Sequence, residues 1–368
     1  MKMPSLTIGR HTALMPVIQG GMGVRVSLSG LAAAVANAGG IGVISSSGIG
    51  LLEPDAKRNY IEANIRALSR EIRTARANSS GPIGVNIMGV LGNYASMVET
   101  SIEEDADLIF SGAGLPLDLP AYRLKASEAR GIEVGTALVP IVSSARAARI
   151  IAKKWLSRYS CLPDAFVVEG PLAGGHLGFK PEELNNPEMR LENIVAEVLE
   201  AVKEFEDKAG RPIPVVGGGG LHSGADICRL IRLGASGVQM GTRFVATTEC
   251  DASPSFKASY INSSPEDVVI IKSPVGLPGR ALKNSFIENF ESQKPPFKCI
   301  FHCITTCFAD KSPYCIAGAL LNAVQGQLEK GFAFCGAQVA KIKEVVSVAE
   351  LMESLRKEFE LCEDPQPA

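Results

Sequence analysis

The sequence predicts an α/β protein of the (β/α)₈, or TIM, barrel class that carries an appended C-terminal subdomain. Short apolar runs alternate with longer segments of helical periodicity from residue 14 to about residue 245. Eight such βα units in roughly 230 residues match a (β/α)₈ barrel. A doubly wound open sheet is the main alternative, but the total of eight strands favours the barrel.

Each predicted strand is a short apolar run of the kind that becomes buried in a parallel sheet. The strands are expected at residues 15–19, 41–45, 83–87, 108–111, 137–142, 165–168, 213–216 and 237–240. The clearest helices between them repeat their apolar residues at helical spacing. They are expected at residues 29–38, 55–77, 143–156, 190–209 and 224–233.

The alternation of strands and helices stops at about residue 250 and does not resume before about residue 331. This stretch is rich in proline, which interrupts helices and central strands. We therefore expect a barrel over residues 1–249 and an appended subdomain over residues 250–334 that packs over the barrel mouth. A last amphipathic helix, at about 345–361 within the segment 335–362, is expected to belong to the barrel.

Composition and charge exclude several classes of protein. Apolar residues make up 46% of the 368 residues and charged residues 21%, so a large core is possible and disorder is not expected. The net charge of −2 argues against nucleic acid or an anionic membrane as a partner. No signal peptide and no apolar run of about 18 residues is visible, so we expect a cytoplasmic protein. In that reducing compartment disulfides are a poor explanation for nine cysteines.

His176 lies in a glycine-rich loop that follows the predicted strand at 165–168. The glycines and the proline of this loop, residues 170–178, do not fit a simple helix. A histidine that is held on tight backbone at the end of a strand can transfer protons. The alternative is an ordinary loop histidine that is hydrogen-bonded to backbone.

Two further glycine motifs follow the seventh and eighth predicted strands. The first motif contributes Gly218, Gly219 and Gly220, and the second contributes Gly241 and Thr242. TIM-barrel enzymes often bind a phosphate between these two loops, because glycine lets backbone N–H groups approach the phosphate oxygens. A tight turn without a ligand is the alternative for the four-glycine run, and the pairing of both motifs favours a phosphate ligand.

The first and third βα units contribute a second group of candidate ligand contacts. Gly20, Gly21 and Met22 follow the first strand without the G-x-G-x-x-G spacing of a dinucleotide fold. Their backbone could face the flat ring of a cofactor, and Asn86 at the end of the third strand could hydrogen-bond a heterocycle. A strand-to-helix turn and a loop cap are the respective alternatives.

Four of the nine cysteines lie within seventeen residues of the appended segment, in the pattern C-x₃-C-x₃-C-x₇-C. They are Cys299, Cys303, Cys307 and Cys315. One interpretation is a metal site, either an iron–sulfur cluster or zinc, which the spacing does not separate. The other is a set of reduced thiols on a single helix, since the first three cysteines recur every four residues.

The chain resembles the nitronate monooxygenase family, formerly called 2-nitropropane dioxygenases. The resemblance lies at residues 15–23, 84–86, 169–176, 214–220 and 234–244. It implies a TIM barrel that binds FMN, with the phosphate between the loops after strands seven and eight. It also implies that Gly174 and Gly175 lie at the cofactor and that His176 stands at the position of the family's catalytic base.

The resemblance implies an FMN-dependent oxidoreductase that oxidises nitronates or nitroalkanes with O₂, with His176 removing the α-proton of a neutral nitroalkane. The alternative is an NAD(P)H-dependent FMN reductase of enoyl thioesters or quinones, because the same superfamily contains enoyl-acyl-carrier-protein reductases. A phosphate-binding protein without redox chemistry is a third class, but it leaves His176 unexplained. All three take a small-molecule ligand, and the sequence leaves a homodimer open.

Overall fold

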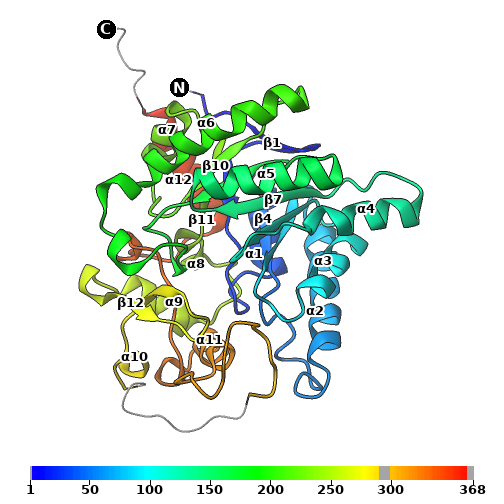
Figure 1. The fold of residues 1–368 in the computed structure, drawn as a ribbon. Coiled ribbons are helices and arrows are strands. Elements are labelled where there is room, and N and C mark those ends of the chain that lie inside the picture. The colour runs from blue at the N-terminus through cyan, green and yellow to red at the C-terminus, as the bar shows by residue number, and fades with distance from the viewer. Residues whose placement is uncertain (1, 290–298, 363–368) are drawn as a thin grey trace.

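A closed barrel of eight parallel strands forms the centre of the protein in the computed structural model, which describes residues 2–289 and 299–362 (Figure 1). The strand order is β3-β11-β10-β8-β7-β6-β5-β4, and a parallel bridge between Ile18 and Ile41 joins the two outermost strands. The strands are β3 (Val17–Gln19), β4 (Gly42–Ser45), β5 (Ile83–Met88), β6 (Leu108–Gly112), β7 (Ala137–Val142), β8 (Phe166–Glu169), β10 (Val215–Gly218) and β11 (Gly237–Met240). The predicted TIM barrel is therefore confirmed, and no predicted strand end is displaced by more than two residues.

Eight helices surround the strands, and the last of them comes from the C-terminal part of the chain. They are α1 (Ser29–Asn37), α2 (Tyr60–Ala77), α3 (Tyr94–Glu103), α4 (Leu119–Arg130), α5 (Ala145–Tyr159), α6 (Leu191–Ala209), α7 (Gly224–Arg232) and α12 (Val348–Glu360). Only the short helix α8 (Thr242–Val245) directly follows the eighth strand. Helix α12 packs against both α1 and α7 and so fills the eighth position of the ring. No helix in the described ranges is both long and apolar enough to cross a bilayer.

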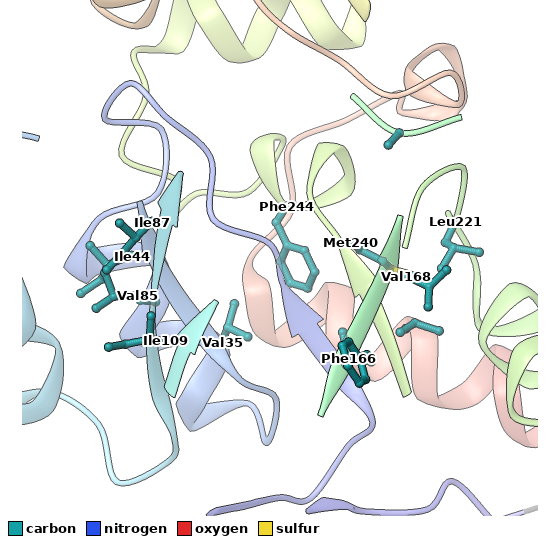
Figure 2. Packing of buried hydrophobic residues seen from close by; sticks show 14 of the residues in the cluster. Val35, Ile44, Val85, Ile87, Ile109, Phe166, Val168, Leu221, Met240 and Phe244 are labelled. Atoms are coloured by element: carbon teal, nitrogen blue, oxygen red, sulfur yellow. The ribbon is translucent and has the colours of Figure 1, made fainter. Parts of the chain in front are cut away.

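Two apolar layers hold the barrel together. The side chains of Ile18, Val43, Phe110, Val139 and Val167 pack in one buried interior cluster. A second cluster lies between the strands and the helices, where alternate residues of the same strands, such as those of β5 and β8, point outward (Figure 2). This alternation follows from the two-residue repeat of a strand.

A hairpin that the sequence analysis did not identify contributes to the interior cluster. Its antiparallel strands are β1 (Leu6–Ile8) and β2 (His11–Ala13). Leu6, Ile8 and Ala13 belong to the same buried cluster as the barrel interior. Strands of three residues are too short to give a sequence pattern.

The segment after the barrel builds a smaller unit at the barrel mouth, in yellow and orange in Figure 1. It contains α9 (Pro254–Ile261), β12 (Val268–Lys272), β13 (Pro278–Leu282), α10 (Ser285–Asn289) and α11 (Ile316–Val324). Its apolar side chains form a core of their own, around Tyr314 and Phe332. β13 pairs with β12 and also with β9 (Gly175–His176), which belongs to the glycine-rich loop after β8. Single 3₁₀ turns lie at Pro181–Glu183, Pro187–Met189, Pro265–Asp267, Leu328–Lys330 and Val339–Lys341.

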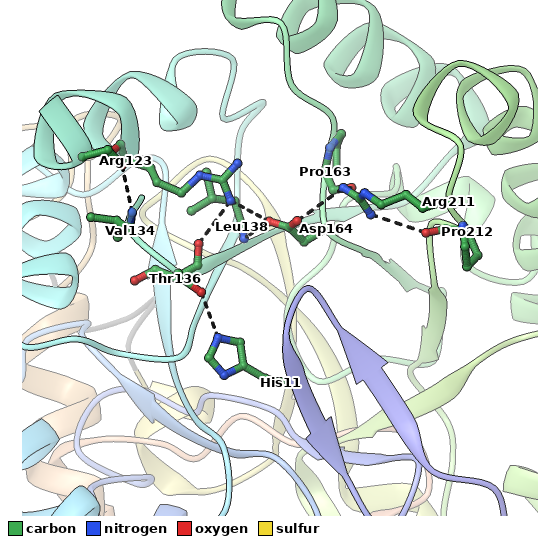
Figure 3. Close-up of polar contacts among 11 residues, drawn as sticks. His11, Arg123, Val134, Thr136, Leu138, Pro163, Asp164, Arg211 and Pro212 are labelled. Carbon is green, nitrogen blue, oxygen red and sulfur yellow. Dashed lines mark hydrogen bonds and ion pairs between the residues drawn. The ribbon is translucent and has the colours of Figure 1, made fainter. Parts of the chain in front are cut away.

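Asp164 organises the polar contacts at the end of the barrel opposite the mouth (Figure 3). Its Oδ2 accepts hydrogen bonds of 2.8 Å from Arg123 Nη1 and from Leu138 N. Its Oδ1 lies 3.4 Å from Arg211 Nη2. Asp164 is buried, so its charge has been taken out of water and depends on these partners.

We expect Asp164→Ala to lower the free energy of unfolding by about 2–4 kcal/mol, because it leaves a partly buried Arg123 guanidinium and the Leu138 N–H without their acceptor. Chemical denaturation measures the change. The control is Glu99→Ala, which removes an exposed partner of Lys125 and should cost at most about 1 kcal/mol. Equal losses for the two variants would show that the Asp164 contacts contribute no more than a surface ion pair.

Candidate functional site

A cavity of about 550 Å³ opens at the carboxyl ends of the barrel strands, where TIM-barrel enzymes carry their active sites. Its floor is the last inward-facing layer of the strands. This layer includes four polar side chains, Ser45, Asn86, Glu169 and Gln239. The appended unit forms the opposite wall through residues that include Leu277 and Phe334, so the cavity lies between the two parts of the chain.

Nearly all the residues that the sequence predicted to be catalytic or cofactor-binding lie around this cavity. Those that line it are Gly20, Gly21, Met22, Asn86, Gly174, Gly175, His176, Gly219, Gly220, Gly241 and Thr242. Gly218 is outside the lining and pairs with Glu169 and Gln239 inside the sheet. Their roles toward a ligand remain predictions.

At one end of the cavity, backbone segments lie so close to one another that side chains would not fit between them. Gly219 and Gly220 have φ of +99° and +78°, a conformation that favours glycine. A Cβ on Gly174 would lie 2.6 Å from Gly336 N, so the loop after β8 touches the chain that precedes α12. Thr242 Oγ1 accepts a 2.7 Å hydrogen bond from Gly336 N and can donate its own proton into the cavity.

Positive charge gathers at this same end. Arg243 Nε is buried and has no hydrogen-bond partner in the described part of the chain, and burial lowers the pKa of this guanidinium. Burial lowers the pKa of His222, and the charges of Arg243 and Lys341 lower it further. Glu358 and Glu344 counter the arginine only in part. Glycine backbone, a free hydroxyl proton and unpaired positive charge together suit an anion such as a phosphate.

In the middle of the cavity, glycine backbone lies against the polar side chains of the floor. A Cβ on Gly21 would lie 2.3 Å from Asn86 Cβ, and one on Gly20 would lie 3.2 Å from Gln239 Cγ. The backbone at Gly20 and Gly21 therefore packs directly on the side chains of Asn86 and Gln239, and all four residues line the cavity. Gln239 was not among the predicted site residues.

His176 lies in the wall that the appended unit completes. Its two-residue strand β9 pairs with β13, with His176 opposite Gly279. Buried Arg280, in β13, donates hydrogen bonds from Nη1 to the carbonyl oxygens of Pro171 and Ala173. The loop that carries His176 is thus fixed at both ends by one strand of the appended unit.

The imidazole of His176 is neutral in this environment. Burial lowers its pKa to about 4, below the usual 6.5. Its Nε2 lies 2.7 Å from Ser273 Oγ, a hydroxyl that suits either neutral tautomer, and its ring packs edge-on against Phe334. A general base is most effective with a pKa near the working pH, and desolvation moves the pKa of His176 well below it.

Glu169 is a functional candidate that the sequence analysis missed. Its carboxyl group lies at the cavity floor, and burial raises its pKa to about 7. Glu169 follows Val167 by two residues and so faces the same side of β8. That parity was the available signal, since an acidic residue in an inward-facing position of a buried strand needs a partner or a function.

The four clustered cysteines lie in irregular chain between residues 299 and 315. The interpretation as one helix with three cysteines on a face is therefore wrong. The loop is held by contacts to distant chain, such as the hydrogen bond from Gly92 N to Cys303 O, which local spacing cannot reveal. Among the described residues no three cysteine, histidine or acidic side chains are grouped so that they could hold a metal ion, so neither the zinc nor the iron–sulfur interpretation is confirmed.

Comparison with known proteins identifies the family. The model of the family described as "Nitronate monooxygenase" matches residues 5–107 and 93–358. The chain belongs to the nitronate monooxygenase family. The resemblance seen in the sequence is therefore confirmed, and membership makes the protein an oxidoreductase.

Relatives of this nitronate monooxygenase family member are named for different activities. A Mycobacterium tuberculosis protein named (3aS,4S,5R,7aS)-5-hydroxy-7a-methyl-1-oxo-octahydro-1H-indene-4-carboxyl-CoA dehydrogenase is 31% identical over 277 residues, which are 75% of this chain and 65% of that protein. The chain thus matches less than two thirds of that relative's length. A probable nitronate monooxygenase of Staphylococcus aureus is 26% identical over 74% of this chain and 76% of its own.

Solved structures agree on the fold. FabK from Thermotoga maritima has a TM-score of 0.70 and 30% identity, with 96% of this chain and 93% of that chain covered. Nitroalkane oxidase from Streptomyces ansochromogenes also has a TM-score of 0.70, covering 95% of this chain and 96% of its own. Its identity of 21% supports the shared fold alone.

The two shifted groups should give the ligand-free protein opposite pH dependences. His176, with a pKa of about 4 when folded and 6.5 when unfolded, makes stability rise with pH between these values, since the unfolded chain binds the extra proton. Glu169, with a pKa of about 7 when folded and 4.5 when unfolded, makes stability fall as pH rises between these values.

Denaturation of ligand-free variants at a series of pH values separates the two contributions. Relative to wild type, Glu169→Gln should become increasingly stabilising as pH rises from 4.5 to 7, and His176→Asn increasingly stabilising as pH falls from 6.5 to 4. Glu99→Gln, which changes an exposed carboxylate, is the control and should show neither trend. Parallel pH curves for all three variants and wild type would contradict the burial argument.

Proposed function

We propose that this protein is an FMN-dependent oxidoreductase whose mouth cavity holds the flavin. The observation that carries the proposal is the arrangement within one cavity. An anion-binding end, glycine backbone beside amide side chains and a partly buried histidine all line it, and these suit a phosphate, a ring and a substrate. A phosphate-binding protein without redox chemistry would use only the first of these three.

The anion-binding end fits the phosphate of FMN. Gly219, Gly220 and Gly241 leave their backbone accessible, the Thr242 hydroxyl has a proton to donate, and Arg243 has a buried N–H without a partner. A phosphate dianion would satisfy these donors, and it would offset the desolvation cost of the arginine.

The floor fits the isoalloxazine ring. The backbone at Gly20 and Gly21 would face the ring, with Met22 beside it and the amides of Asn86 and Gln239 available to its polar edge. Gly174 and Gly175 would border the cofactor from the loop after β8, and Glu169 would accept hydrogen bonds from hydroxyl groups. When bound, FMN supplies the electron-transfer chemistry, and the protein positions and tunes it.

His176 is the proposed proton acceptor. Because its imidazole is neutral, one ring nitrogen has a lone pair that can accept the α-proton of a carbon acid. Ser273 Oγ is hydrogen-bonded to Nε2 of the ring. Ser273 therefore holds the ring in place if Nδ1 accepts the proton, and shares the proton if Nε2 accepts it. A negatively charged product beside it would stabilise the imidazolium form and so counter the low pKa. Phe334 and the strand β13 keep the ring in place.

The proposed substrates are nitronates and nitroalkanes, oxidised with O₂. The second candidate is an NAD(P)H-dependent reduction of enoyl thioesters or quinones. A specific observation favours it, because a relative at 31% identity is named for a CoA thioester, whereas the relative named a nitronate monooxygenase is 26% identical. For this chain, the activities named for these relatives are proposals.

Anaerobic mixing separates the two candidates. One sample of purified protein with bound FMN is mixed with NADPH, and a separate sample is mixed with a nitronate. The flavin absorbance is followed in both. Bleaching by the nitronate alone supports the first candidate. Rapid bleaching by NADPH, followed by reoxidation with an enoyl thioester, supports the second, and a colourless protein that takes up no FMN would refute both.

Thr242→Ala is expected to weaken FMN binding by about 1.5–3 kcal/mol, or roughly ten- to a hundred-fold in Kd, since it removes one hydroxyl donor to a charged acceptor. Titration of cofactor-free protein with FMN, followed by fluorescence, measures the change. Thr248→Ala alters an exposed threonine outside the cavity and should leave Kd unchanged. Equal affinity of all three proteins would place the phosphate elsewhere.

His176→Asn is expected to slow turnover of a neutral nitroalkane by roughly 10²–10⁴-fold, the usual contribution of a general base. Turnover of the pre-formed nitronate needs no proton abstraction and should fall much less, with FMN content near normal. His11→Asn, far from the mouth and bonded to Gly135 O, is the control. Equal loss on both substrates would assign His176 to binding rather than proton transfer.

A further inference from the structure

We propose that Cys299, Cys303, Cys307 and Cys315 hold a [4Fe–4S] cluster in a second cavity beside the proposed FMN cavity. This site goes beyond the proposed function, which needs no metal. The sequence alone left iron–sulfur cluster, zinc and plain thiols unseparated, and the geometry of the folded chain separates them.

All four cysteines line one cavity of about 200 Å³, together with His302, Ile304, Thr305 and Ile316. Seventeen residues of irregular chain thus place four cysteines around a common space, whereas unrelated surface thiols would point in separate directions.

The size of this space decides between one ion and a cluster. A zinc ion bound by four thiolates at about 2.3 Å brings the sulfur atoms to within about 3.8 Å of one another and leaves no cavity between them. The volume here equals that of about six or seven water molecules. An iron–sulfur cluster with four cysteine ligands fills such a space with its own iron and sulfide atoms.

The loop is fixed in this shape by distant chain. Gly92 N donates to Cys303 O at 3.0 Å, Thr305 N donates to Val90 O at 2.9 Å, and Thr306 Oγ1 donates to Val275 O at 3.0 Å. A Cβ on Gly92 would lie 2.7 Å from His302 O, so the two chains touch through backbone. The cysteines are therefore held in place before any cofactor arrives.

Hydrogen-bond donors lie beside the cysteines. Cys315 is the residue before α11, so the free backbone N–H groups at the start of this helix follow it directly in the chain. Within the described residues the buried Tyr60 hydroxyl has no hydrogen-bond partner, and Tyr60 packs in one cluster with Cys303 and Cys315. Donors of this kind stabilise the sulfur atoms of a cluster.

The two cavities share a wall. Cys303, Ile304 and Ile316 line both of them, and Tyr60 lines the larger one. A cluster in the smaller cavity would therefore lie directly beside the proposed FMN site, with only the Cys303 segment between them.

The test is metal and sulfide analysis of the full chain, purified without oxygen and reconstituted with ferrous iron and sulfide. We expect about four iron and four acid-labile sulfide per chain, together with an electron paramagnetic resonance signal after reduction with dithionite. One zinc per chain, iron without sulfide, or no metal would overturn the proposal. FMN content is measured on the same samples, so failure of the cluster and failure of the flavin proposal are distinguished.

Cys307→Ser is the principal variant, because this side chain is partly exposed and its loss should disturb the fold least. We expect iron and sulfide to fall at least several-fold while FMN content stays near that of the parent protein. Cys161→Ser, which changes a partly exposed cysteine outside both cavities, is the matched control and should retain the full cluster. Iron retained in Cys307→Ser and Cys299→Ser alike would show that the metal is bound elsewhere.

Discussion

The pairing of β9 with β13 is the contact on which the functional half of the structure depends. It joins the glycine-rich loop after β8 to the appended unit, and Arg280 reinforces it with hydrogen bonds to two carbonyl oxygens of that loop. A buried guanidinium is costly unless its donors are satisfied, so Arg280 favours only the arrangement in which the loop lies beneath it. The barrel alone would leave His176 on a glycine-rich segment without a fixed direction.

The two ends of the barrel differ in how completely their buried charged groups are paired. At the end of the barrel opposite the mouth, Asp164 accepts hydrogen bonds from Arg123 and from the backbone N–H of Leu138, and these contacts stabilise the fold. At the mouth Arg243, Glu169 and His176 are buried or partly buried without comparable partners, and their pKa values are shifted by desolvation. Such uncompensated groups lower the stability of an empty protein, and they are characteristic of sites where a ligand completes the set.

The barrel was predictable because its signals are local. Each strand is a short apolar run, and the glycine motifs after β10 and β11 mark positions that their place in the βα order assigns to the mouth. The same reasoning, extended by strand parity, would have reached Glu169. It could not reach β9, which has two residues, or the bond from Arg280 to Pro171, which joins positions 109 residues apart. The helix predicted for the cysteine segment was wrong for the same reason. The four-residue spacing of the cysteines is typical of a helix, but backbone contacts to residues 90–92 determine the shape of the segment.

Helix α12 has a consequence for the way this chain is made. The eighth place in the helix ring is filled only after the whole appended segment, by residues 348–360, although the strand it covers ended at Met240. On the ribosome the first seven βα units would emerge with the surfaces of α1 and α7 uncovered, and the ring would close only after residues 348–360 have been made. Contacts between residues far apart in the sequence are slow to form, so these apolar surfaces stay uncovered while the whole appended segment is made.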